Sequence, residues 1–138
     1  MRVEEAKEAW PSGIVEYEIP GGWTVLAGKN DAVNDLLTFK LARSNDYWFH
    51  VHGMPGSHVL LRARPGVDPD RKTLKDAAAI AAFHSKARTG GVVPVSCTMA
   101  RYVTKPPGAK PGTVQIRKES VLKVRPGLPE GSSVISPR

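Results

Sequence analysis

The chain has 138 residues, the length of one domain with its own core, and a net charge of +7, which favours a polyanionic partner such as nucleic acid over a membrane surface. Cys97 is the single cysteine, which excludes an intramolecular disulfide and a thiolate-rich metal cluster. Because the N-terminus is acidic and no apolar run resembles a secretory signal or a transmembrane span, we expect a cytoplasmic protein without membrane contact.

The first part of the chain predicts a lead-in, two strands and a helix. Residues 1–13 form the expected peripheral lead-in, and residues 14–26 read as two short strands around the turn Pro20-Gly21-Gly22. A helix over about residues 31–43 follows, with Asn30 or Asp31 as its N-cap. Its apolar side chains form one stripe: Val33, Leu36, Leu37 and Leu41.

The middle of the chain predicts a second strand pair and a second helix. Strands over residues 47–51 and 57–64 are joined by the Gly/Pro-rich segment 53–56. The helix is expected over about residues 73–88, with Thr73 and Asp76 as a capping box and Thr89-Gly90-Gly91 as its end. Small residues on one of its faces favour close packing against a sheet.

The last part predicts strands over residues 92–97 and 99–104, a stiff basic loop over 105–112 and a terminal hairpin from 113–117 and 121–125. Residues 127–138 are expected to be a flexible tail. Strands punctuated by only two principal helices predict an α+β fold. We therefore expect a single domain over residues 14–126, with a mainly antiparallel sheet and both helices packed against it.

Basic residues are concentrated in the C-terminal third. Residues 101–125 contain seven lysines and arginines against the single acid Glu119: Arg101, Lys105, Lys110, Arg117, Lys118, Lys123 and Arg125. Each alone is an ordinary solvated charge. Together, on outward positions of neighbouring strands, they form an electrostatic footprint that fits phosphate.

Residues 46–59 hold three of the four histidines. On a strand, alternation places Tyr47, Phe49 and Val51 on one face and Trp48, His50 and His52 on the other. The first face fits a core. The second offers a ring and imidazoles for a base or a phosphate, although a tryptophan in this position is also a common core residue.

Three patterns have both a catalytic and a structural interpretation. His50 and His52 with His58 could hold a metal or be hydrogen-bonded imidazoles. Cys97 could pair with a histidine as a nucleophile or be a buried thiol. Gly28-Lys29-Asn30 could bind phosphate or form a turn and cap. Since no further catalytic or metal motif accompanies them, we expect no metal, no cofactor and no enzymatic activity.

Several short motifs, in order, resemble the NFACT-R domain. They are Gly28-Lys29-Asn30, Asn34-Asp35-Leu36-Leu37-Thr38, Lys40-Leu41-Ala42, Asp46-Tyr47-Trp48-Phe49-His50-Val51, Pro55-Gly56-Ser57-His58-Val59, Ala77-Ala78, Ala81-Ala82-Phe83-His84-Ser85-Lys86-Ala87, Val103-Thr104-Lys105-Pro106 and Gly108-Ala109-Lys110-Pro111-Gly112. The resemblance covers about residues 14–126. Val33 departs from a glutamine that members often carry, and His52-Gly53 departs from a common Lys-Asp, beside the expected binding face.

The resemblance implies RNA binding. In long family members this domain is the C-terminal part of ribosome quality-control factors that engage tRNA and the large ribosomal subunit. Those members also carry a glycosylase-like domain, helix-hairpin-helix motifs and a coiled coil that this sequence does not show. Shorter members are linked to tRNA modification, which implies a tRNA-modifying enzyme as a partner. Met1 and the acidic lead-in favour a free-standing protein.

We therefore predict a non-catalytic RNA-binding module for tRNA or rRNA. Its recognition face would comprise Asp46, Trp48, His50, Ser57, His58, Arg62 and Arg64, and its phosphate contacts Lys105, Lys110, Arg117, Lys123 and Arg125. Lys29, Asn30, Asn34, His52 and Arg101 complete the predicted RNA-binding residues. The alternatives are a metal- or histidine-dependent RNA-processing or RNA-modifying enzyme and a protein-interaction adaptor.

Overall fold

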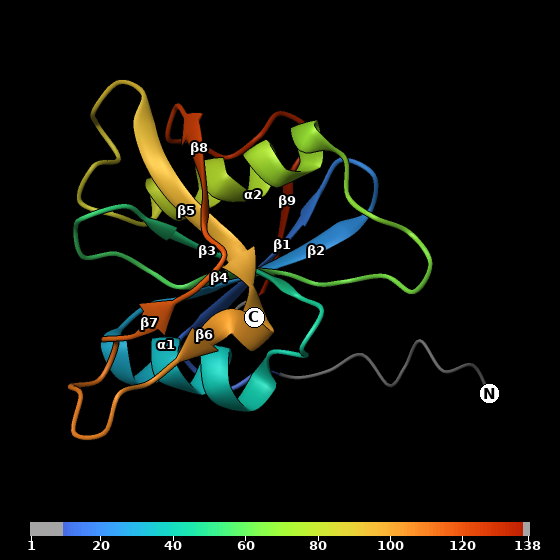
Figure 1. The fold of residues 1–138 in the computed structure, drawn as a ribbon. Helices are drawn as coiled ribbons and strands as arrows, with labels where there is room; N and C mark the ends of the chain where they lie inside the picture. The colour runs from blue at the N-terminus through green and yellow to red at the C-terminus, as the bar shows by residue number, and fades with distance from the viewer. Residues whose placement is uncertain (1–9, 137–138) are drawn as a thin grey trace.

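A seven-stranded antiparallel sheet forms the centre of the computed structural model, which describes residues 10–136 (Figure 1). Residues 1–9 of the expected lead-in lie outside the described residues. The strands follow the order β8-β5-β3-β4-β2-β1-β9. Their bounds are Ile14–Ile19 (β1), Trp23–Gly28 (β2), Tyr47–Val51 (β3), Val59–Leu61 (β4), Val93–Met99 (β5), Ser120–Val124 (β8) and Ser133–Ser136 (β9). The predicted α+β fold with a large antiparallel sheet is confirmed.

The first hairpin forms where the sequence predicts it. β1 and β2 pair from Ile14 opposite Gly28 to Ile19 opposite Trp23. In the connecting turn Gly21 and Gly22 have φ angles of +93° and +77°, which L side chains rarely adopt. The two glycines therefore allow the chain to reverse directly between the two strands.

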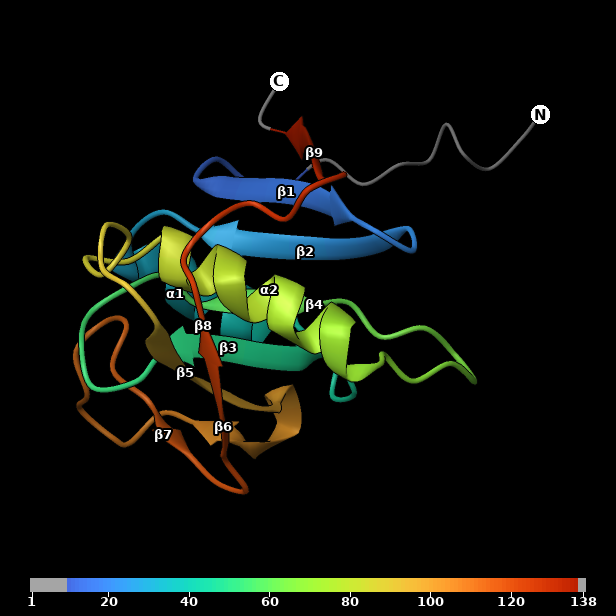
Figure 2. The same ribbon diagram turned by 90° about the horizontal axis from the view of Figure 1, so that it is seen from above.

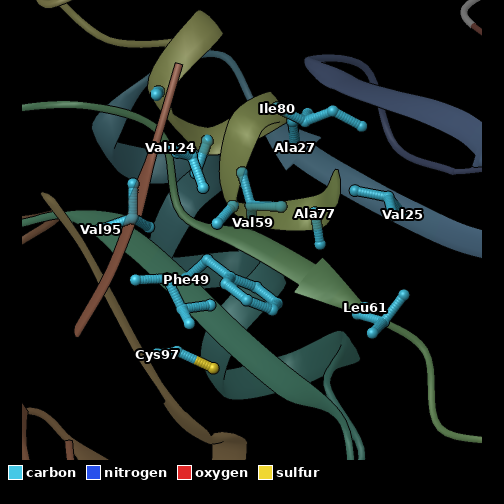
Figure 3. Packing of buried hydrophobic residues seen from close by; sticks show 14 of the residues in the cluster. Val25, Ala27, Phe49, Val59, Leu61, Ala77, Ile80, Val95, Cys97 and Val124 are labelled. Carbon is cyan, nitrogen blue, oxygen red and sulfur yellow. The ribbon is translucent and has the colours of Figure 1, made fainter. Parts of the chain in front are cut away.

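Helices cover both faces of the sheet. Helix α2 (Arg71–Phe83) lies across one face, and helix α1 (Asp31–Leu36), extended by a π-helical segment over Leu37–Leu41, lies against the other (Figures 1 and 2). Under α2, aliphatic side chains of the sheet meet Ala77 and Ile80 around Phe49 (Figure 3). Among the described residues, no helix is long and apolar enough to span a bilayer.

The face under α1 has its own core. Leu26, Leu60 and Trp48 of the sheet pack there with Leu37 of the π-helical segment. A short ribbon of β6 (Val103–Thr104) and β7 (Gln115–Ile116) completes this layer and lies on the same side as α1 (Figure 1). The sheet is therefore sandwiched between two layers, and neither face of its central strands is open to solvent.

Both helices differ from the prediction at their ends. The carboxylate of Asp70 caps α2 by accepting a hydrogen bond from the Thr73 backbone N–H at 2.8 Å, so the predicted capping box of Thr73 and Asp76 is wrong. The helix stops at Phe83, well before residue 88, and the chain beyond it turns to contact the segment before β4: the His84 carbonyl accepts from the Ser57 N–H at 3.2 Å.

The first helix is split. Asn30 is confirmed as the N-cap of α1, where its side chain accepts from the Val33 N–H at 2.9 Å. The regular α-helix ends at Leu36, and the chain continues with the wider π-helical turns, closed by a bond from the Ala42 N–H to the Leu37 carbonyl at 2.9 Å. The widened segment points Leu37 and Thr38 into the interior.

The predicted terminal hairpin is wrong. β7 pairs with β6, while β8 pairs with β5, from Val93 opposite Val124 to Cys97 opposite Ser120. Between them the chain crosses from the ribbon to the sheet edge at Lys118, whose φ angle is 56°. The Thr98 hydroxyl holds this crossing by donating to the Arg117 carbonyl at 2.6 Å.

Part of the expected flexible tail is a strand. β9 pairs with β1, with Val134 opposite Tyr17 and Ser133 opposite Glu18. The outer edge of β1 presents unpaired N–H and C=O groups, and β9 satisfies them. Four residues are too short a segment for a periodic pattern to reveal.

The carboxylate of Asp46 links separate parts of the chain. Asp46 is fully buried and accepts from the N–H groups of Arg43 and Ala63 at 2.9 and 2.8 Å and from the Arg62 guanidinium at 2.7 Å. Its backbone carbonyl accepts from the Ala100 N–H at 2.8 Å. The start of β3 is thereby tied to the chain after the first helix and to the ends of β4 and β5.

We expect Asp46→Ala to lower the free energy of unfolding by about 3–5 kcal/mol, because two backbone N–H groups and the Arg62 guanidinium all lose an acceptor in the interior. Asp76→Ala is the matched control. Asp76 pairs with the exposed Lys72 at 2.8 Å, and removing it should cost less than about 1 kcal/mol. Urea unfolding of both variants measures the difference, and equal losses would contradict the role given to Asp46.

Candidate RNA interface

A cleft beside the C-terminal end of β3 brings three histidines together. His50, His52 and His58 line it with Ser96 and Glu119, and its volume is about 360 Å³. The segment Gly112–Val114 and Ile116 form its opposite wall. We call this feature the histidine cleft.

At the bottom of the histidine cleft, His58 belongs to a buried hydrogen-bond network. The indole N–H of Trp48 donates to Thr38 Oγ1 at 3.1 Å, so the Thr38 hydroxyl proton is free to donate to His58 Nδ1 at 2.7 Å. His58 Nε2 then carries the proton that is donated to the Gly112 carbonyl at 3.2 Å. The network is complete when His58 is neutral. Burial, reinforced by neighbouring His50, lowers the pKa of His58 to about 4.

Trp48 is a core residue. Only 2% of it is exposed, and its ring stacks on His50 with a centroid distance of 5.8 Å and an interplanar angle of 11°. No base can stack on this ring without opening the core. Burial also lowers the pKa of His50, which is half-buried beside it.

Other predicted recognition residues are also buried in structural contacts. Asn34 is 2% exposed and accepts from the His58 N–H at 3.0 Å, and Ser57 donates to the Gly28 carbonyl. A Cβ at Gly28 would clash with the Asn34 amide, so this glycine makes the contact possible. With Asp46, they fix the backbone and offer little surface to a ligand; their predicted contact with RNA stays a prediction.

His52 is exposed at the rim of the cleft. Its Nδ1 lies 3.0 Å from Ser96 Oγ and 3.0 Å from Glu119 Oε2, and Ser96 itself donates to that carboxylate. In a catalytic triad the histidine contacts the nucleophile and the acid through different ring nitrogens. Here both contacts converge on one nitrogen, so this group is not arranged as a triad.

Three of the predicted cations are engaged within the fold. Arg62 pairs with Asp46, and its side chain is only 12% exposed. Arg64 donates to the Gly21 carbonyl at 2.7 Å and lies 4.0 Å above the Trp23 ring. Lys105 pairs with Asp35 at 3.1 Å and donates to two carbonyls of its own loop. Because these contacts partly compensate their charges, the three side chains attract an RNA phosphate less strongly.

The remaining predicted cations are exposed, and of these Arg101 also donates to Asn45 Oδ1 at 2.7 Å. None of them pairs with a carboxylate of the described residues: Lys29, Arg101, Lys110, Arg117, Lys123 and Arg125. Lys123 lies on the edge strand β8, and Arg125 follows directly after its last residue, Val124. Lys29 lies directly before the N-cap Asn30, away from the others in sequence.

Sequence reasoning missed Tyr102. The ring lies 5.0 Å from the Arg101 guanidinium, 5.4 Å from that of Arg117 and 5.5 Å from the Lys118 ammonium. Hydrogen bonding to Arg101 and the charges of Lys118 and Arg117 lower the pKa of the phenol. Residues 117–118 lie where the chain passes from β7 to β8, and this passage brings them close to Tyr102. No local sequence pattern predicts that contact.

Catalytic chemistry finds little support in the site geometry. Burial raises the pKa of the Cys97 thiol to about 12, so the nucleophilic thiolate is scarce. Within the described residues, no three His, Cys, Asp or Glu side chains gather as ligands for one metal. Both ring nitrogens of His58 are already bonded within the fold.

The family pattern described as the NFACT protein RNA-binding domain matches residues 15–118. The chain belongs to this family. The match runs from β1 through both helices to the β6–β7 ribbon and ends before β8, and it confirms the resemblance that the sequence motifs indicate.

Curated relatives share the domain within longer chains. The protein named Rqc2 homolog RqcH from Bacillus subtilis is 44% identical over 80% of this chain and 19% of its own length. The protein of the same name from Streptococcus suis is 42% identical over 77% of this chain and 19% of its own length. The chain thus spans about a fifth of the relatives that it matches.

A solved structure has the same fold. The C-terminal part of the fibronectin/fibrinogen-binding protein from Streptococcus suis aligns with a TM-score of 0.78 and 38% sequence identity. The alignment covers 88% of this chain and 49% of the other.

The buried histidines predict a domain that is less stable in acid. The folded-state pKa of His58, about 4, lies below its ordinary value of 6.5. Its contribution is therefore fully present above pH 6.5 and is lost as the pH falls toward 4, because unfolding then takes up a proton. The loss amounts to at most about 3.5 kcal/mol, at about 1.4 kcal/mol per pKa unit. Urea unfolding at pH 7.5, 5.5 and 4.5 measures it.

The His58→Gln variant distinguishes the contribution of His58 to the acid sensitivity from that of the carboxylates, which titrate in the same pH range. Glutamine keeps an N–H donor for the Gly112 carbonyl and does not titrate. The variant should be less stable at pH 7.5 but should lose less stability on acidification than the wild type. Parallel pH profiles for the two proteins would show that His58 does not cause the acid sensitivity.

Proposed function

We propose that this domain binds RNA without catalysing a reaction, through the open cations on the β7–β8 side of the sheet. Its biological context would be ribosome-associated quality control in the cytoplasm, with tRNA or rRNA of the large subunit as ligand. A tRNA-modifying enzyme is a second partner consistent with the family resemblance. Membership of an RNA-binding family supports the ligand class, and the names of the relatives support the context.

The observation that carries the proposal is the contrast between two sets of cations. Arg62 and Lys105 have carboxylate partners in the fold. The exposed cations Arg117, Lys123 and Arg125 have none among the described residues. Unpaired cations on one side of a domain attract a polyanion and release its counterions on binding.

The phosphate contacts would come from the loop before β7 and from β8. Lys110 lies in the loop between β6 and β7, Lys123 lies on the outer strand β8, and Arg125 follows the end of that strand. A backbone held by these residues would run along the β8 edge. Such contacts position an RNA without reading its sequence.

The proposal predicts a steep dependence of affinity on salt. With about four to six phosphates engaged, a plot of log K against log salt should have a slope of about −3 to −5. Fluorescence anisotropy with a labelled tRNA at several salt concentrations measures the slope. A slope near zero would exclude phosphate contact as the main source of affinity.

The Lys123→Ala and Arg125→Ala double variant should flatten this slope by roughly two units, one for each lost phosphate contact, and should weaken all RNAs about equally. Lys75→Ala with Lys86→Ala is the matched control, because it removes two exposed positive charges from α2 and the turn after it. Equal flattening by both pairs would mean that net charge, not the β8 edge, determines binding.

A further inference from the structure

A pocket opens beside Tyr102, where the N-terminal end of α2 leaves the sheet. Its volume is about 360 Å³. Its wall is mainly apolar and comes from three strands and α2: Tyr47, Leu74, Cys97, Met99 and Leu122. Arg71 and Lys118 stand at its rim with Tyr102. We call this feature the Tyr102 pocket; it is separate from the histidine cleft, which shares none of its lining residues.

The rim of the Tyr102 pocket has a concentrated positive charge. Three cations, Arg101, Arg117 and Lys118, lie within 5.5 Å of the Tyr102 ring centre. Neither they nor Arg71 pair with a carboxylate of the described residues. Like charges held this close repel one another, and an anion placed between them would relieve the repulsion.

The backbone holds this arrangement in place before any ligand binds. The Arg117 N–H donates to the Tyr102 carbonyl at 3.1 Å, and the Thr98 hydroxyl donates to the Arg117 carbonyl at 2.6 Å. Lys118 adopts a φ angle of 56°, unusual for a residue other than glycine, asparagine or aspartate. Backbone strain of this kind is often found at functional sites. Here it directs an ammonium group to an aromatic ring.

We propose that the Tyr102 pocket binds an unpaired RNA base, which stacks on Tyr102 while Lys118 and the flanking arginines contact its phosphates. The proposal rests on the RNA-binding function and gives it a site. Single-stranded RNA is recognised by this combination of an aromatic ring, an apolar recess and a cationic rim. A duplex, whose bases are stacked and paired, cannot insert one without opening.

A second hollow continues the surface toward the neighbouring nucleotide. Tyr47 and Met99 line both it and the Tyr102 pocket, so the two adjoin. The second hollow has a volume of about 530 Å³, and Arg43 and Arg64 line it. Arg43 therefore gives the second hollow a cation for a neighbouring phosphate, whereas Arg64 is already held by the Gly21 carbonyl and the Trp23 ring, and Asp68 adds a carboxylate to the lining.

The test compares single-stranded and duplex RNA of equal length with variants of the whole domain. Tyr102→Leu should weaken binding of the single strand about 5- to 150-fold, the effect of losing one base–aromatic stack, while Tyr102→Phe should keep most of the affinity. Affinity for a blunt duplex should change less than about twofold. A 2-aminopurine in the single strand should lose fluorescence on binding the wild type and Tyr102→Phe, but not Tyr102→Leu.

A second variant distinguishes the loss of an RNA contact from the loss of the fold. Lys118→Gly removes the cation and relieves the backbone strain, so it should melt no lower than the wild type. Its salt slope with the single strand should flatten by about 0.7. Lys86→Ala removes the same charge from the turn after α2, beyond the end of the helix opposite to Arg71, and should leave the slope unchanged.

The outcomes separate the two proposals. If the wild type binds no RNA, the proposed function fails. If the wild type binds RNA but folded Tyr102→Leu and Lys118→Gly bind single strands as well as it does, the Tyr102 pocket is not the base site and the RNA function stands. If polyglutamate loses as much affinity as RNA on Tyr102→Leu, the pocket is a docking site for acidic segments and the base inference is overturned.

Discussion

The buried carboxylate of Asp46 is the contact on which the geometry of this domain depends most. It lies at the start of the central strand β3 and accepts hydrogen bonds from the segments that follow the first helix and β4. Its backbone carbonyl holds Ala100, the residue at which the chain leaves β5. Tyr102 follows two residues later, so the backbone at Asp46 anchors the chain close to the point where this aromatic ring lies.

The motifs that identify the family mostly encode the fold. Trp48, Thr38 and His58 form one hydrogen-bonded unit, and Asn34 holds the His58 backbone. Each has a polar atom buried against a partner, so each tolerates few alternatives. The proposed RNA contacts, in contrast, come from single lysines and arginines that carry no local pattern of their own.

Alternation along β3 predicted which side chains share a face, and the structure agrees: Phe49 faces α2, whereas Trp48 and His50 face the other side. The sequence left open whether Trp48 on this second face is a core residue or a stacking platform, because periodicity does not reveal whether a further layer covers a face; in the structure Trp48 is buried. The π-helical segment and the β6–β7 ribbon supply that layer. Their position depends on contacts between residues far apart in sequence.

The path of the chain from β7 to β8 also depends on contacts between residues far apart in sequence, so the sequence did not predict it. The sequence favoured a local hairpin, and local pairing is the default where two short strands follow one another. A lysine at positive φ redirects the chain instead, and propensity argues against a lysine there. Tertiary contacts stabilise this unusual backbone conformation at Lys118, above all the hydrogen bond that the Thr98 hydroxyl donates to the Arg117 carbonyl.

The two edges of the sheet avoid self-association by different means. At one edge β9 covers β1, with Val134 opposite Tyr17. A shortened protein that stopped at residue 126 would leave the N–H and C=O groups of β1 open to any strand that approached, a route to aggregates. At the other edge, Lys123 on β8 and Arg125 directly after it are exposed. If the β8 strands of two molecules paired, their positive charges would lie close together and repel. The charges proposed to bind RNA therefore also oppose dimerisation through β8.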